Sequence, residues 1–146
     1  MGMSYERTSE IFTAVWQSAG DCQGWALDRF LAVASEALDS YADTMMWCVP
    51  DESGECSADE LDNDLWHEAA ENVAEFLLAA GSDDIEEWAS VFGPWDVGHC
   101  LWLTSDRHGA GFWDRGAGGL GDRLTDIAHN FQIYVYAGDD GTLYQS

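Results

Sequence analysis

Apolar residues recur at helical spacing through the first two thirds of the chain. Ile11, Phe12, Val15 and Trp16, for example, fall on one face of a helix that Gly20 would end. The Ser-x-x-Glu pattern at residues 57–60 matches a capping box, in which the two side chains satisfy free backbone donors at a helix start. The spacing predicts four helices, over residues 5–19, 24–47, 57–80 and 83–91, with a loop over residues 49–57.

The last third of the chain has shorter apolar runs separated by Gly-rich turns. Its pattern predicts a helix over residues 118–130 and strands over residues 100–104, 111–114, 132–137 and 142–144. This β-β-α-β-β order predicts a small antiparallel sheet with one helix packed on it. We therefore predict an α+β fold in a single domain, residues 1–146, with an acidic helical lobe over 1–96 and the β-β-α-β-β scaffold over 97–146.

Charge changes this picture more than any motif does. The chain has 28 acidic residues and five basic ones, all Arg, for a net charge of −23. Because 47% of the residues are hydrophobic and eight are Trp, the chain is a folded domain and not an acidic disordered segment. The surface could imitate a polyanion, belong to a halophile or serve solubility alone. The acids concentrate in residues 1–98, and this asymmetry favours an interaction surface over a halophilic coat.

The helix predicted from residue 57 would carry acids at spacings of four, four, three and four residues. Four such like-charge neighbours would cost the helix roughly 1–2 kcal/mol. Carboxylates four residues apart lie about 6 Å apart along a helix axis, close to the spacing of phosphates along a nucleic-acid strand. A solvated helix face is the alternative. The predicted partner-binding residues are Glu60, Asp64, Glu68, Glu71 and Glu75, extended by Asp39, Asp43, Asp51, Glu52 and Glu55.

Other candidate chemistry is weaker. His99 with Cys48, Cys56 and Cys100 could form a zinc site, but these residues lack the C-x-x-C spacing of such sites. We expect no metal, no cofactor and free thiols. The first ten residues have no basic region or apolar core, and no run of 18 apolar residues occurs, so neither a signal peptide nor a membrane span is expected.

A resemblance comes from the motifs at residues 98–104, 108–116, 120–122 and 138–141, which read GH-x-LWLT, HGAGFWDRG, LGD and GDDG. Over residues 97–146 the chain resembles a recurrent family of small bacteriophage proteins of unassigned function. The resemblance implies a phage origin and supplies no catalytic residues. In charge and size, the chain is similar to phage DNA mimics that block restriction enzymes, CRISPR effectors or DNA-repair enzymes.

These observations predict a non-enzymatic acidic inhibitor, a DNA mimic that acts in the host cytoplasm. Its partner would be a host DNA-binding protein, and it would bind neither nucleic acid nor a membrane directly. The eight Trp residues could supply an apolar patch through which two copies form a homodimer. The alternative is a phage structural or regulatory protein that uses the Gly-rich C-terminal motif without mimicry. A small enzyme using His108 and Asp114 is a third interpretation.

Overall fold

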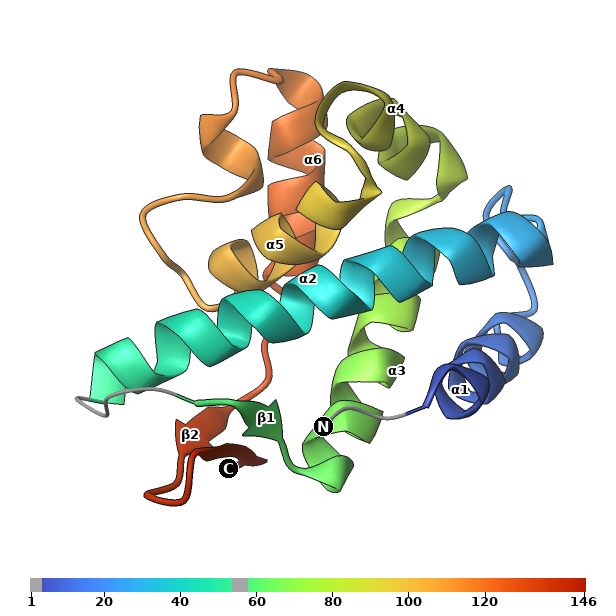
Figure 1. The fold of residues 1–146 in the computed structure, drawn as a ribbon. Coiled ribbons are helices and arrows are strands. Elements are labelled where there is room, and N and C mark those ends of the chain that lie inside the picture. Colours follow the sequence, from blue (N-terminus) through green and yellow to red (C-terminus); the bar gives the residue numbers. More distant parts are fainter. Residues whose placement is uncertain (1–3, 54–57) are drawn as a thin grey trace.

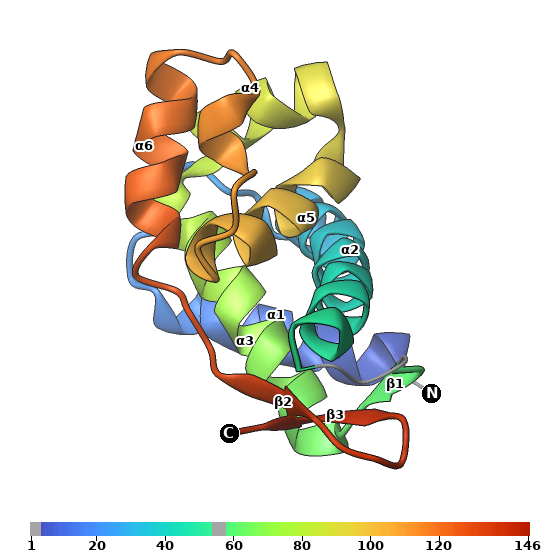
Figure 2. The same ribbon diagram turned by 90° about the vertical axis from the view of Figure 1, so that its left-hand side faces the viewer.

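The fold is mostly helical (Figures 1 and 2). The computed structural model describes residues 4–53 and 58–146, except for the side chains of 51–53. Its elements are α1 (Tyr5–Ser18), α2 (Leu27–Ser53), β1 (Glu60–Leu61), α3 (Asn63–Ala80), α4 (Ser82–Phe92), α5 (Pro94–Ser105), a 3-10 turn (Phe112–Asp114), α6 (Gly119–Ala128), β2 (Val135–Ala137) and β3 (Thr142–Gln145). Over the described residues, no helix is both long and apolar enough to cross a membrane.

Helix α2 crosses the middle of the molecule, with α4, α5 and α6 on one side and the small sheet on the other (Figures 1 and 2). Helix α5 approaches α2 closely at Gly98, where a Cβ would overlap the carbonyl oxygen of Ala37. Next to this contact, the rings of Tyr41 and Trp102 meet edge to face, 5.6 Å apart. Helix α5 spans the predicted lobe boundary at residues 96 and 97, and its apolar side chains belong to the same buried core as those of α2.

Two helices, α1 and α3, begin at a side-chain cap. Arg7 donates its backbone N–H to the Ser4 hydroxyl at the start of α1. At the start of α3, the Asp62 carboxylate accepts from the backbone N–H of Asp64, so this helix begins at Asn63. The prediction of a helix from residue 57 is therefore wrong at its start. Ser57 itself lies outside the described residues.

The prediction of an α+β fold is wrong because residues 100–104 are helical. They form the second half of α5, which begins with Pro94 at the position where its fixed φ favours a helix. Residues 97, 98 and 100–105 are all buried, so α5 is buried on most sides, and its apolar run resembles that of a buried strand. Residues 111–114, the predicted partner strand, instead contain the 3-10 turn. No β-β-α-β-β unit is therefore formed.

The observed sheet has three short strands in the order β1-β3-β2. Strands β2 and β3 form an antiparallel pair, as predicted for residues 132–137 and 142–144, although β2 begins only at Val135. Strand β1 adds a parallel edge, with Glu60 opposite Thr142 and Leu61 opposite Leu143. Helix α2 continues to Ser53 with Pro50 inside it, although the sequence predicts a loop from residue 49.

Candidate functional site

Most Arg side chains are used in ion pairs on the side of the molecule that holds α4 and α5. Three of the five pair with a carboxylate there: Arg29 with Glu86, Arg123 with Asp84, and Arg115 with Asp96, at N–O distances of 2.7, 3.0 and 2.8 Å. The Arg29 hydrogen bond and charge lower the pKa of the Glu86 carboxyl below its usual value. These three Arg side chains therefore neutralise carboxylates within the fold.

A first acidic groove lies between α2 and β1. Its volume is about 410 Å³, and it is lined by Glu36, Asp39, Asp43, Met46, Asp59, Glu60, Trp66 and Trp95. Three of these lining acids, Glu36, Asp39 and Asp43, belong to α2. Over the described residues, no Arg or His forms an ion pair with them. Partial burial raises the pKa of Asp39, and the nearby charges of Asp43 and Glu36 raise it further. This groove therefore concentrates negative charge beside two indole rings.

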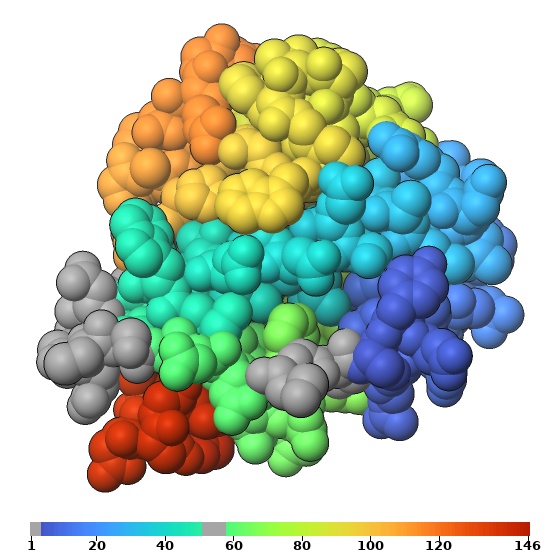
Figure 3. Space-filling view, viewed as in Figure 1, coloured from blue at the N-terminus to red at the C-terminus, as the bar shows by residue number. Residues whose placement is uncertain are grey.

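Figure 3 shows the exposed surface of α2. The helix surface lies open on this face of the molecule, between α5 (yellow) and the green surface of the β1–α3 segment. Trp95, at the start of α5, is 47% exposed and stacks on the His99 ring with centroids 5.7 Å apart. Trp47, farther along α2, is 72% exposed. Exposed indoles and carboxylates therefore occur along the same helix and its border.

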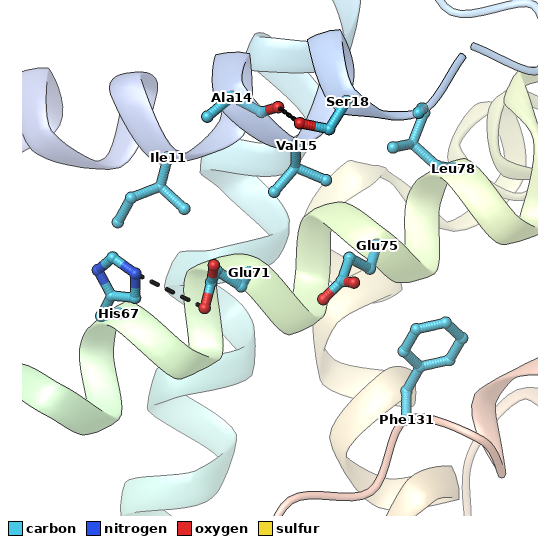
Figure 4. A pocket seen from close by; sticks show the side chains of 10 residues that line it. Ile11, Ala14, Val15, Ser18, His67, Glu71, Glu75, Leu78 and Phe131 are labelled. Carbon is cyan, nitrogen blue, oxygen red and sulfur yellow. Dashed lines mark hydrogen bonds and ion pairs between the residues drawn. The ribbon is translucent and has the colours of Figure 1, made fainter. Parts of the chain in front are cut away.

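A second groove, shown in Figure 4, runs between α1 and α3 and has a volume of about 560 Å³. Ile11 and Val15 of α1 line one wall, and Glu71 and Glu75 of α3 line the other. His67 Nε2 lies 3.6 Å from a Glu71 carboxylate oxygen. The pKa of Glu75 is raised by partial burial, and then by the charges of Glu71 and Glu68.

The predicted acidic residues therefore do not form one ridge. Glu60 belongs to β1 and lines the α2–β1 groove with Asp39 and Asp43, whereas Glu71 and Glu75 line the α1–α3 groove. Asp64 and Glu68 remain on α3, as predicted. Asp51 and Glu52 belong to the last turn of α2, and their side chains, like the whole of Glu55, lie outside the described residues.

Some groove residues were not among the predicted site residues. Glu36 could have been found, because it lies three residues before Asp39 and seven before Asp43, on the same face of one helix. Trp66 and Trp95 could not, because only the packing of α3 and α5 against α2 brings their rings to this groove.

Two residues of the candidate zinc site, His99 and Cys100, have partners within the fold. The Thr44 hydroxyl donates to the Ser40 carbonyl oxygen, so it accepts from Nδ1 of His99, which lies 2.8 Å away. Burial lowers the pKa of His99. The Cys100 thiol donates to the Asp96 carboxylate, at 3.3 Å. Over the described residues, no three His, Cys, Asp or Glu side chains are grouped as metal ligands, and Cys56 lies outside those residues.

The Gly-rich segment is held by contacts of its backbone. Gly111 has a φ of +149°, and a Cβ there would overlap the Thr104 hydroxyl oxygen. That hydroxyl accepts from the backbone N–H of Phe112, and Asp114 accepts from the backbone N–H of Gly111. His108 Nε2 lies 2.9 Å from a carboxylate oxygen of Asp106.

Side chains of this segment also anchor the core. The Phe112 ring is fully buried, 5.7 Å from the Phe76 ring and 5.0 Å from the Trp88 ring. Arg115 donates to one oxygen of Asp96, and the Trp88 indole N–H donates to the other. These contacts give the most distinctive motif of the sequence a role in folding.

Comparison with known proteins does not add a family to this description. No family model, curated protein or solved structure matches the chain. The resemblance to phage proteins therefore depends on the sequence motifs alone.

Proposed function

We propose that this protein is an acidic inhibitor of bacteriophage origin that binds a DNA-binding protein of the host in place of DNA. It acts in the host cytoplasm and catalyses no reaction. One observation carries the proposal: among the described residues no Arg pairs with the clustered carboxylates of α2 and α3, while three Arg side chains pair with acids of α4 and α5. The clustered carboxylates are Glu36, Asp39 and Asp43 on α2 and Glu68, Glu71 and Glu75 on α3.

The energetic argument starts from repulsion within each cluster. Like charges three or four residues apart on a helix cost about 0.2–0.5 kcal/mol per pair. Asp39 and Glu75 both have pKa values raised by burial and by acidic neighbours, which indicates that their charges repel in the folded state. A fold selected for stability alone would place Arg or Lys among these acids. A basic partner surface would relieve the repulsion on binding.

The arrangement also suits a surface that grips phosphates. Carboxylates four residues apart on α2 and α3 repeat about every 6 Å along each helix axis. Trp47 and Trp95 add exposed rings, on which Arg side chains of a partner could stack. The partner would then contact the protein with the same Arg and Lys side chains that otherwise hold DNA.

The test is displacement of host proteins from DNA. Proteins of a bacterial lysate are bound to DNA-cellulose and eluted with the purified chain at about 0.1 M salt, where a Debye length is about 10 Å. The wild type should release a defined protein, and raising the salt should abolish its complex with that protein. A variant with Asp39→Asn, Asp43→Asn, Glu68→Gln and Glu71→Gln should release much less.

The control removes two carboxylates that pair with Arg, with Asp84→Asn and Glu86→Gln, and is compared with the two-residue variant Asp39→Asn with Glu71→Gln, which removes the same charge. It should release as much protein as the wild type, because its clusters on α2 and α3 are intact. Equal release by the cluster variant, or a stable complex that still holds DNA in its usual groove, would exclude direct mimicry.

A further inference from the structure

The α1–α3 groove combines apolar walls with carboxylates (Figure 4). Its apolar surface comes from Ile11 and Val15 of α1, from Leu78 of α3 and from the Phe131 ring. Glu71 and Glu75 lie between these side chains, along the α3 wall. The volume of about 560 Å³ is within the range of small-molecule sites.

The groove also carries an excess of negative charge. Over the described residues, no Arg pairs with Glu71 or Glu75, and His67 is the one ion-pair partner of Glu71. The raised pKa of Glu75 reflects a carboxylate that is partly removed from water and close to two others. An anion would be repelled here, and a neutral apolar molecule would desolvate the carboxylates further without compensation. A cation with an apolar body would satisfy both surfaces.

We propose that this groove binds a small organic cation, namely a protonated amine carried on an aromatic or aliphatic body. The ammonium group would lie between the carboxylates of Glu71 and Glu75. The body would pack against Val15, Leu78 and the Phe131 ring, whose face also attracts cations. The site does not depend on the proposed inhibition of a host protein, because a molecule of this size needs only the groove.

Methyl NMR spectra can test the site with phenethylammonium as the probe, at constant ionic strength. The methyl signals of Ile11, Val15 and Leu78 should shift and saturate. Phenethyl alcohol, which has the same body without the charge, should bind at least about tenfold more weakly. Methylammonium, which has the charge without the body, should give no saturable shift of these methyl groups.

Two variants separate this site from general attraction of cations to an acidic protein. Ala14→Phe, at an exposed position that lines the groove, fills the space and keeps every charge, so it should abolish the shifts. The same variant should still displace host protein from DNA, which separates this proposal from the proposed function. Glu71→Gln with Glu75→Gln should weaken binding at least about tenfold.

Three outcomes would overturn the proposal. The first is equal affinity for the alcohol and the amine. The second is shifts that persist in Ala14→Phe, and the third is an affinity that the two Gln substitutions leave unchanged. Because the methyl spectra also report folding, a variant that unfolds is recognised directly. Ala14→Leu is then the smaller substitution with which the blocking test is repeated.

Discussion

Neutralising one central acid in each cluster should stabilise the protein. Asp39→Asn combined with Glu71→Gln removes four like-charge pairs, since each residue lies three or four positions from two other carboxylates: Glu36 and Asp43 for Asp39, and Glu68 and Glu75 for Glu71. At about 0.2–0.5 kcal/mol per pair, the gain is about 1–2 kcal/mol. The loss of the exposed His67–Glu71 contact subtracts little from it. For a domain near this size, Tm should rise by about 2–8 °C.

Urea and thermal unfolding at low salt, followed by Trp fluorescence, would measure this gain. Raising the salt to about 1 M shortens the Debye length to about 3 Å, so the advantage of the double variant should shrink. If salt leaves the stability gain of the double variant unchanged, then relief of charge repulsion does not cause that gain.

The pH dependence gives an independent check on Asp39. Its pKa in the folded protein lies above the ordinary value of 3.8, so the native state binds this proton more tightly than the unfolded state does. Protonation of Asp39 therefore adds to the free energy of unfolding below pH 3.8. This contribution is lost as the pH rises from 3.8 through the higher pKa of the folded protein. Asp39→Asn should match the wild type near about pH 2.5 and exceed it at neutral pH.

The control is Glu86→Gln, which removes one negative charge, as Asp39→Asn alone does, but from an acid that is paired with Arg. Glu86 accepts two hydrogen bonds from Arg29, at 2.7 and 2.8 Å, so its loss should cost up to about 1 kcal/mol. If the double variant loses stability while Glu86→Gln gains it, the acids of α2 and α3 support the fold, and the argument for a functional surface fails.

Three further substitutions or reagents test the fold. Phe112→Ala should cost about 3–5 kcal/mol in urea unfolding, because it empties a fully buried position; a cost under about 1 kcal/mol would contradict the folding role of the Gly-rich segment. Gly98→Ala should cost about 1–3 kcal/mol or more, since the added methyl overlaps the Ala37 carbonyl, and unchanged stability would mean that α5 does not approach α2 so closely. In native protein, iodoacetamide should modify the partly exposed Cys22 before the fully buried Cys100, whose pKa is raised by burial; mass spectrometry showing the reverse order would contradict this packing.

The helices were predictable where the signals are local. The helix over residues 5–19 matches α1 closely, because an amphipathic stripe and a glycine near its end define it. The start of α3 was not predictable, because Asp62 is also a good N-cap residue. In addition, Glu60 belongs to β1, which pairs with a strand about eighty residues away. A parallel pair of two residues leaves no periodic pattern in the sequence.

The strand predicted at residues 100–104 fails for a different reason. Five apolar or small residues in a row fit a buried strand and a buried helix equally well. The helix prevails because Pro94 starts it and Gly98 allows it to cross α2 at close range. That close approach is a property of two segments about sixty residues apart, so neither segment alone indicates it.

The location of the acidic site depended even more on distant contacts. The sequence places the negative charge in residues 1–98 as a whole. In the structure, Arg123 and Arg115 of the last third return to Asp84 and Asp96, 39 and 19 residues earlier in the chain. The acids of α4 and α5 are thereby partly neutralised, whereas among the described residues no Arg pairs with the clustered acids of α2 and α3. A surface selected only for solubility has no reason to concentrate charge in this way, whereas a surface that replaces DNA needs such a concentration on one part of the molecule.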